Sequence, residues 1–159
     1  MSDAARHREN LRGAIAGRAM AYLRIWEAIR KRHGEAEATA IMKEAIYARG
    51  CEIGQAFRHI DKKDMAGLRD AFLAYLPDPD MLQPEVHCSD AGLDIKFHDC
   101  PLKAAWQAAG LEGEELAKLC EIAGVVDNGT FEAAGFDFHA ETWKPGQEGC
   151  CFIHVRPGD

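Results

Sequence analysis

The stretch "VHCSDAGLDIKFHDCPLKAAW", residues 86–106, changes its hydrophobic period halfway along. Leu93, Ile95 and Phe97 alternate with polar residues, which is the period of two expected of a strand with one buried face. The turn sequence "SDAG" comes just before them, so the stretch is predicted to begin as a β-hairpin. From Pro101 the apolar residues recur at steps of three and four, and proline suits the first position of a helix. A hairpin followed directly by a helix is therefore the centre of the predicted fold.

Upstream of this stretch, residues 1–77 are predicted to be helical. A long first helix with one apolar stripe ends near Gly34, and a second helix covers about residues 35–57. A third helix follows. The second helix contains Gly50 and Gly54, and the missing Cβ atoms predict that another helix crosses it closely at this point.

Downstream, residues 85–157 are predicted to form a hairpin, two helices and a second hairpin, whose turn is Pro145-Gly146. The fold class is therefore α+β. N-terminal helices precede an antiparallel sheet of about four strands, and helices cover one face of that sheet. The sequence contains no linker and no internal repeat, so we predict a single domain over residues 1–159.

The composition is that of a globular protein, with 47% hydrophobic and 28% charged residues. No stretch is long and apolar enough to span a membrane, and Arg12, Arg18 and Arg24 interrupt the apolar residues near the N-terminus. We therefore expect a cytoplasmic protein. The six cysteines should then be reduced, so each is a core residue, a ligand or a nucleophile.

The net charge of −7 argues against a nucleic acid as partner, because binding phosphates requires a basic surface. The basic residues are concentrated in the first helix, which is expected to lie on an acidic body rather than on a membrane. A small molecule is the expected partner. The sequence leaves the oligomeric state open, a homo-oligomer included.

Cys100 is the most informative residue of the quoted stretch. It precedes Pro101 and is the predicted N-cap of a helix, where free N–H groups and the helix dipole stabilise a thiolate. We expect its pKa to fall below the free value of about 8.5. His98, two residues earlier, is placed to accept its proton. A small buried thiol that happens to precede a helix is an equally good interpretation.

Cys120, Asp127 and Phe131 share one face of the helix that opens at "GEEL" and ends at Gly135. Core packing is sufficient to explain Cys120. Asp127 is different, because a carboxylate on an apolar face is costly unless it is paired or used. Burial would raise its pKa toward values that suit acid–base catalysis.

The chain ends with "GQEGCCFIHVRPGD", residues 146–159, which contains two adjacent cysteines. Ile153 and Val155 mark the core face of the last strand, and strict alternation puts Cys151 on that face. Cys150 is then expected to point to the other face. Cys151 is therefore predicted to join the cysteines and the carboxylate of the two preceding helices.

Three of these cysteines with His98 or Asp127 would also make a tetrahedral zinc set. However, the chain has no C-x-x-C pair and no paired-histidine spacing. It also lacks a glycine-rich phosphate loop, a G-x-S-x-G elbow and a dinucleotide fingerprint. We therefore expect no cofactor, with zinc as the alternative.

Two segments, "CPLKAAWQAAGLEGEELAKLCEIAGVVDNGTFEAAGFDF" and "GCCFIHVRPG", resemble the L-2-amino-thiazoline-4-carboxylic acid hydrolase family over residues 100–157. The shared features are a cysteine that opens a helix, a later Leu-Cys pair, an Asp-x-Gly-x-Phe-Glu stretch and a terminal strand with two cysteines. The family hydrolyses the ring of a cysteine-derived aminothiazoline to an N-carbamoyl amino acid. The resemblance also implies an α+β architecture related to the 4-vinyl reductase and TRAPP-subunit domains.

The resemblance implies four catalytic residues: Cys100, Cys120, Asp127 and Cys151. The expected reaction is hydrolysis of a C–N or C–S bond in a small five-membered N/S heterocycle, an aminothiazoline- or thiohydantoin-like carboxylic acid. Cys100 would attack the ring carbon, and Asp127 would move protons. Further site residues are expected to be His98 near the thiol and, for substrate binding, Trp106, Thr130, Phe131, His154 and Arg156. The alternative is a small-molecule or zinc-binding sensor module of the 4-vinyl-reductase type.

Overall fold

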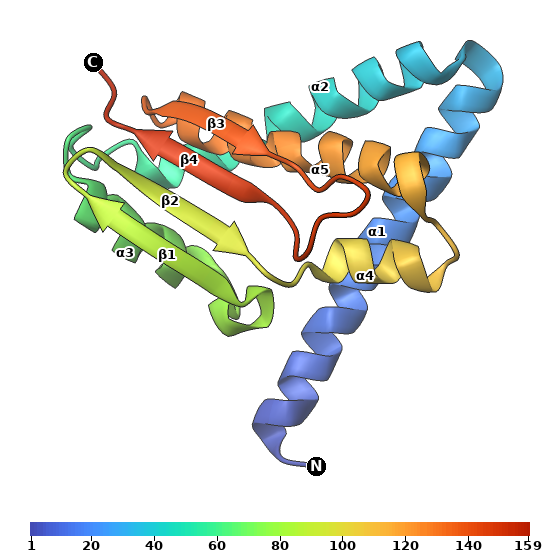
Figure 1. Cartoon of the computed structure of the whole chain (residues 1–159), viewed down its shortest axis with the longest axis horizontal. Coiled ribbons are helices and arrows are strands. Elements are labelled where there is room, and N and C mark those ends of the chain that lie inside the picture. Colours follow the sequence, from blue (N-terminus) through green and yellow to red (C-terminus); the bar gives the residue numbers. More distant parts are fainter.

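The predicted hairpin forms one half of a four-stranded antiparallel sheet in the computed structural model, which describes residues 1–159. The strands are β1 (Pro84–Ser89), β2 (Gly92–Phe97), β3 (Asp137–Glu141) and β4 (Phe152–Arg156). Their order across the sheet is β1-β2-β4-β3, so the last strand lies between β2 and β3 (Figure 1). The α+β class and the antiparallel sheet of four strands are confirmed.

Five α-helices complete the fold: α1 (Asp3–His33), α2 (Glu35–Gly54), α3 (Met65–Tyr75), α4 (Pro101–Ala108) and α5 (Gly113–Ala133). Two short 3₁₀ turns, η1 (Gln55–Phe57) and η2 (Pro79–Leu82), follow α2 and α3. No helix is both long enough and apolar enough to cross a membrane.

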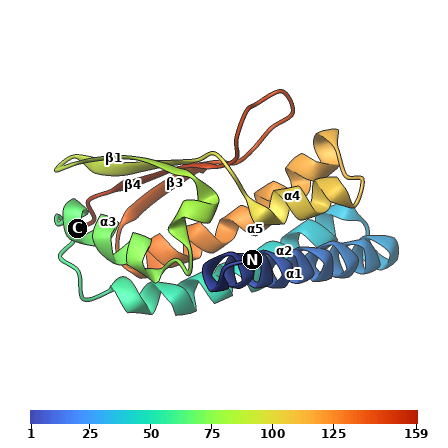
Figure 2. The same ribbon diagram turned by 90° about the horizontal axis from the view of Figure 1, so that it is seen from below.

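The helices lie on one side of the sheet, and the other face of the sheet is open (Figure 2). The alternation read from the sequence explains this arrangement. Leu93, Ile95, Ile153 and Val155 are fully buried on the helix side, where they meet Phe131 of α5. The residues between them in the strands are polar and face away from the helices.

A second group of buried side chains fills the space between α1, α2, α4 and α5. Trp26 and Trp106 are its largest fully buried members, and both are about 1% exposed. The indole N–H of Trp106 donates a hydrogen bond to the carbonyl oxygen of Ala19 in α1, at 2.8 Å. This contact joins α4 to the long first helix.

The close helix crossing predicted from Gly50 and Gly54 is confirmed, and the crossing helix is α5. A Cβ atom placed on Gly50 would lie 2.2 Å from the carbonyl oxygen of Val126, and one on Gly54 would lie 2.4 Å from that of Thr130. Gly129 of α5 makes the reciprocal contact with the backbone of α2. The two backbones therefore touch directly, which fixes the position of α5 under the sheet.

The first half of α1 extends beyond the rest of the molecule (Figure 1). Two ion pairs hold it. Arg8 pairs with Asp78 at 2.5 Å, and Arg12 pairs with Asp99 at 2.5 Å. The second pair is next to Cys100, so the basic helix neutralises the negative charge that precedes the predicted N-cap.

Candidate active site

Four thiols converge at the end of the sheet where β2 leads into α4. Cys100 opens α4, Cys120 lies on α5, and Cys150 and Cys151 end the loop between β3 and β4. The Sγ atoms of Cys150 and Cys151 are 3.8 Å apart. Cys150 also exchanges a hydrogen bond with Cys100, and both influence the ionisation of Cys120. All six cysteines of the chain are free.

The orientation predicted for the two adjacent cysteines is wrong. Cys150 is the buried one, at 3% exposure and within the sheet core, whereas Cys151 is half-buried. The backbone explains the shift, because Cys150 N–H donates to Phe97 O and Phe97 N–H donates to Cys151 O, each at 2.9 Å. Two successive residues thus face a single residue of β2, which is a β-bulge. The bulge breaks the alternation and allows both sulfurs to lie on the same side.

Cys100 is the N-cap of α4, as predicted, with φ −143° and ψ 111°. The low pKa expected for it is wrong. The hydrogen bond that its thiol donates to Cys150 raises the pKa of Cys100 most, and burial raises it further. The helix N–H groups of Leu102 and Lys103 lower this pKa, but they do not outweigh the other two effects. The Cys100 thiol is therefore protonated at neutral pH.

Cys120 and Cys150 are also protonated at neutral pH. Burial and the neighbouring thiols raise the pKa of Cys120 to about 12. For Cys150, the hydrogen bond from Cys100 lowers the pKa, but Cys151 and burial raise it to a net value of about 12. The two thiols shift each other in opposite directions, because Cys150 raises the pKa of Cys100 and Cys100 lowers the pKa of Cys150.

Asp127 lies two turns after Cys120 on the same face of α5. Asp127 is half-buried, and its carboxyl group forms no hydrogen bond. Burial raises its pKa to about 7, in the direction that the sequence predicts. It has no direct contact with the thiols.

The raised pKa of Asp127 predicts a pH-dependent change in stability. The folded protein holds this proton up to about pH 7, whereas an unfolded aspartate releases it near pH 3.9. Unfolding therefore becomes easier as pH rises from about 4 to 7. Relative to wild type, Asp127→Asn should be more stable at pH 8 than at pH 5, measured by urea unfolding at both values. Asp70→Asn is the control, because the hydrogen bond from Arg69 lowers the pKa of Asp70 and any pH-dependent contribution of this group falls below about pH 4, so its difference from wild type should be the same at pH 5 and pH 8. A pH-independent difference for Asp127→Asn would contradict the prediction.

Two lysines hold the loop that carries the adjacent cysteines, and the sequence analysis missed both. Lys103 Nζ donates to Gly149 O at 2.5 Å and lies 4.8 Å from the ring centroid of Trp143. Lys96 Nζ donates to Cys150 O at 2.7 Å. The sequence could have indicated Lys103 as a site residue by its position, because it lies three residues after Cys100 and in the first turn of α4.

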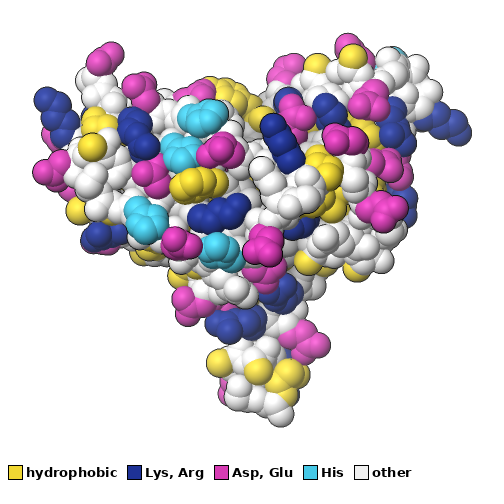
Figure 3. Space-filling model, viewed as in Figure 1, with side chains coloured by type: hydrophobic (Ala, Val, Ile, Leu, Met, Phe, Trp, Pro, Cys, Tyr) yellow, Lys and Arg dark blue, Asp and Glu magenta, His cyan; other side chains and the backbone are white.

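The structure does not place three of the predicted site residues near the thiols: His98, His154 and Arg156. They lie on the open face of the sheet, where histidines and acidic residues gather (Figure 3). His98 contacts Glu85 of β1, at 2.9 Å from Nε2. The sheet itself separates His154 and Arg156 from the buried Cys150.

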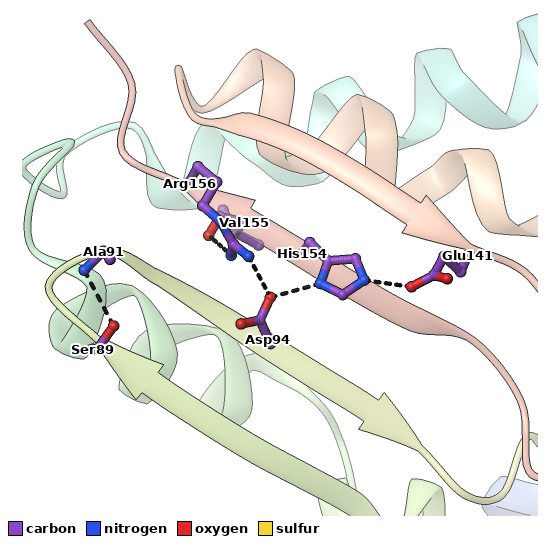
Figure 4. Close-up of polar contacts among 7 residues, drawn as sticks. All are labelled: Ser89, Ala91, Asp94, Glu141, His154, Val155 and Arg156. Carbon is purple, nitrogen blue, oxygen red and sulfur yellow. Dashed lines mark hydrogen bonds and ion pairs between the residues drawn. The ribbon is translucent and has the colours of Figure 1, made fainter.

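His154 links three strands across this open face (Figure 4). Its Nδ1 lies 2.6 Å from Asp94 of β2, and its Nε2 lies 2.7 Å from Glu141 of β3. Arg156 pairs with the same Asp94 at 2.9 Å. Since carboxylates only accept hydrogen bonds, keeping both contacts requires a doubly protonated imidazolium. These charged side chains pair with one another and connect β2, β3 and β4 across the sheet.

Trp106, Thr130 and Phe131, predicted to bind substrate, are packed in the interior. Trp106 is held by Ala19, as described above, and Phe131 is fully buried in the sheet core. The Thr130 hydroxyl donates to Val126 O, one turn earlier in α5, at 2.8 Å. The structure thus gives these three side chains protein partners instead of access to a ligand.

The zinc set considered from the sequence is not assembled. No group of three or more His, Cys, Asp or Glu side chains is placed to hold a metal ion. Two of the surface clefts have volumes of about 550 Å³, between α2, α5 and β3, and about 710 Å³, beside the first turns of α1. None of the predicted site residues lines either cleft.

A family model describes most of this chain. The model of L-2-amino-thiazoline-4-carboxylic acid hydrolase matches residues 14–154. The match therefore includes most of α1 and all of α2 and α3, in addition to the C-terminal half in which the sequence resemblance was found. A search of curated proteins finds no match. The chain belongs to the L-2-amino-thiazoline-4-carboxylic acid hydrolase family, whose members are hydrolases of a small heterocycle.

Proposed function

We propose that this protein hydrolyses a small five-membered N/S heterocycle that carries a carboxylate, such as 2-amino-2-thiazoline-4-carboxylate. The observation that supports the proposal most is the convergence of Cys100 and Cys150 at the start of α4 in a chain of this family. The sulfurs come from segments far apart in the sequence. A hydrogen-bonded thiol pair is a source of a sulfur nucleophile for the carbon that lies between the ring nitrogen and the ring sulfur.

In the proposed reaction the sulfur of Cys150 adds to this ring carbon, and the Cys150 proton passes to the ring nitrogen. A basic acceptor is needed because the thiols are protonated at neutral pH. The amidine-like nitrogen of the substrate is such an acceptor. The Cys100 thiol then donates its hydrogen bond to the sulfur that reacts. This assigns the attack to Cys150 and a supporting role to Cys100, the reverse of the order expected from the sequence.

The bond between the ring carbon and the ring sulfur then breaks, and the ring sulfur leaves as a thiol by taking the proton that the ring nitrogen had received from Cys150. The carbon remains attached to Cys150. Water attacks the same carbon, one of its protons goes to the nitrogen, and the other returns to the Cys150 sulfur as the bond to Cys150 breaks, so the product is an N-carbamoyl amino acid with a free thiol. The sum is substrate plus one water. Asp127 is proposed to take a proton from this water, because a carboxyl group with a pKa of about 7 exchanges protons readily at neutral pH. None of these steps requires a cofactor.

The purified protein should convert 2-amino-2-thiazoline-4-carboxylate to a product with the mass of substrate plus one water. A thiol reagent should detect one new thiol per turnover. The free ring without protein and the Cys150→Ser variant are the controls. If neither the mass nor the thiol appears with wild type, this ring is not the substrate.

A further inference from the structure

Lys103 is a partly buried cation without an acidic partner. Its ammonium group contacts a backbone carbonyl, Gly149 O, and the face of Trp143, and it forms no salt bridge. Lys43 and Lys118, by contrast, both pair with Glu121. A backbone carbonyl is a weaker partner for an ammonium group than a carboxylate is.

The charge of Lys103 lies near the thiol cluster. Lys103 is one turn after Cys100 in α4, and it lowers the pKa of Cys120 across the gap to α5. The carbonyl that it binds belongs to Gly149, which immediately precedes Cys150. A small ring that meets the sulfur of Cys150 would therefore have a positive charge beside it.

We propose that Lys103 binds the carboxylate of the substrate and so selects carboxylic acid rings over uncharged ones. This inference rests on the proposed function, because it takes the thiol cluster as the site of the ring. On arrival of the carboxylate, the Lys103 ammonium exchanges Gly149 O for a charge-assisted contact. The role differs from the one expected of His154 and Arg156, whose charges are engaged on the opposite face of the sheet.

Lys96 offers a matched comparison. It also lacks a carboxylate partner within salt-bridge distance, and it holds the next carbonyl of the same loop, Cys150 O, at 2.7 Å. Its place in β2 is among the residues that face away from the core, and its charge lowers the pKa of Glu141 on the open face. If the lysines act only by holding the loop, the two should behave alike. If Lys103 binds the substrate, the two should differ.

The test is calorimetric binding of two rings, 2-amino-2-thiazoline-4-carboxylate and 2-amino-2-thiazoline, which lacks the carboxylate. Each protein carries Cys150→Ser so that the ligand is not consumed. Lys103→Met should weaken binding of the carboxylate ring by about 10- to 100-fold and leave binding of the other ring within about twofold. Lys96→Met should show no such selectivity.

The inference would be overturned if Lys103→Met weakened binding of both rings equally or of neither. It would also be overturned if the Cys150→Ser protein that retains Lys103 failed to bind the carboxylate ring. Hydrolysis by wild type is measured separately. A protein that binds the carboxylate ring through Lys103 but releases no product retains the inference and loses the proposed function. Lys103→Arg, which keeps the charge, should restore most of the selectivity.

Discussion

Cys150→Ser is expected to lower kcat/KM for the ring carboxylate by on the order of 1,000-fold, because it removes the proposed nucleophile. Cys100→Ala should cost less, about 10- to 100-fold. It removes a hydrogen-bond donor to the reacting sulfur, not the sulfur itself. Steady-state kinetics on the purified variants measure both effects.

Cys51→Ser is the matched control for these substitutions. Cys51 is a partly buried thiol of α2, outside the thiol cluster, so its replacement should leave kcat/KM unchanged. Melting temperatures of the variants separate loss of activity from loss of folding. If Cys100→Ala abolishes turnover while Cys150→Ser retains it, the nucleophile is Cys100, as the sequence analysis expected. If both variants remain active, the thiols are not catalytic.

The contrast between Cys100 and Cys150 shows how far local sequence signals reach at this site. The N-cap position of Cys100 follows from the proline after it, and the structure confirms that position. Its pKa does not follow, because the dominant contribution comes from a thiol fifty residues later in the chain. Helix geometry is a local property that a short stretch can encode. The ionisation of a buried group depends on whatever the tertiary fold places beside it.

The β-bulge is a second feature that alternation alone could not reveal. A period of two correctly places Ile153 and Val155 in the core, and it holds as far as Phe152. The alternation fails at the two residues before Phe152, because Phe97 pairs with both Cys150 and Cys151. Gly149, with φ +72°, is the residue next to the bulge that indicates an irregular backbone. One inserted residue was enough to exchange the buried and half-buried cysteines.

The open face of the sheet shows a different kind of error. The same alternation that buries Ile153 already places His154 on the opposite side, so the pattern itself argued against a shared site. The sequence could not show that Asp94 and Glu141 flank His154, because this depends on β4 lying between β2 and β3. The order of strands in the sheet decides which polar residues become neighbours.

Gly50→Ala is expected to destabilise the fold by about 1–3 kcal/mol, even though alanine is the better helix former. The added Cβ would lie 2.2 Å from Val126 O, 3.0 Å from the Cα of Gly129 and 3.0 Å from the backbone nitrogen of Thr130. All three are backbone atoms of α5, so no side-chain rotation can relieve the overlap. The two helices must move apart, which loosens the cores on both sides of α5.

Gly17→Ala supplies the matched control. Gly17 lies in α1, and a Cβ placed on it meets nothing within 4 Å. The same chemical change should therefore stabilise the protein by roughly 0.5–1 kcal/mol, through helix propensity alone. Urea unfolding of the two variants beside wild type measures both shifts. A Gly50→Ala protein as stable as wild type would show that α2 and α5 do not touch through their backbones.

The glycine contact also has a consequence for activity, because α5 carries both Cys120 and Asp127. A helix displaced from Gly50 would shift these groups relative to Cys150, whose loop is anchored to β2 and α4 instead. Gly50→Ala should therefore lower kcat/KM in protein that is still folded, whereas Gly17→Ala should not. Gly129→Ala, whose Cβ would lie 2.2 Å from Tyr47 O, should act in the same way. The double variant should lose less stability than the sum of the two single variants, because one separation of the helices relieves both overlaps.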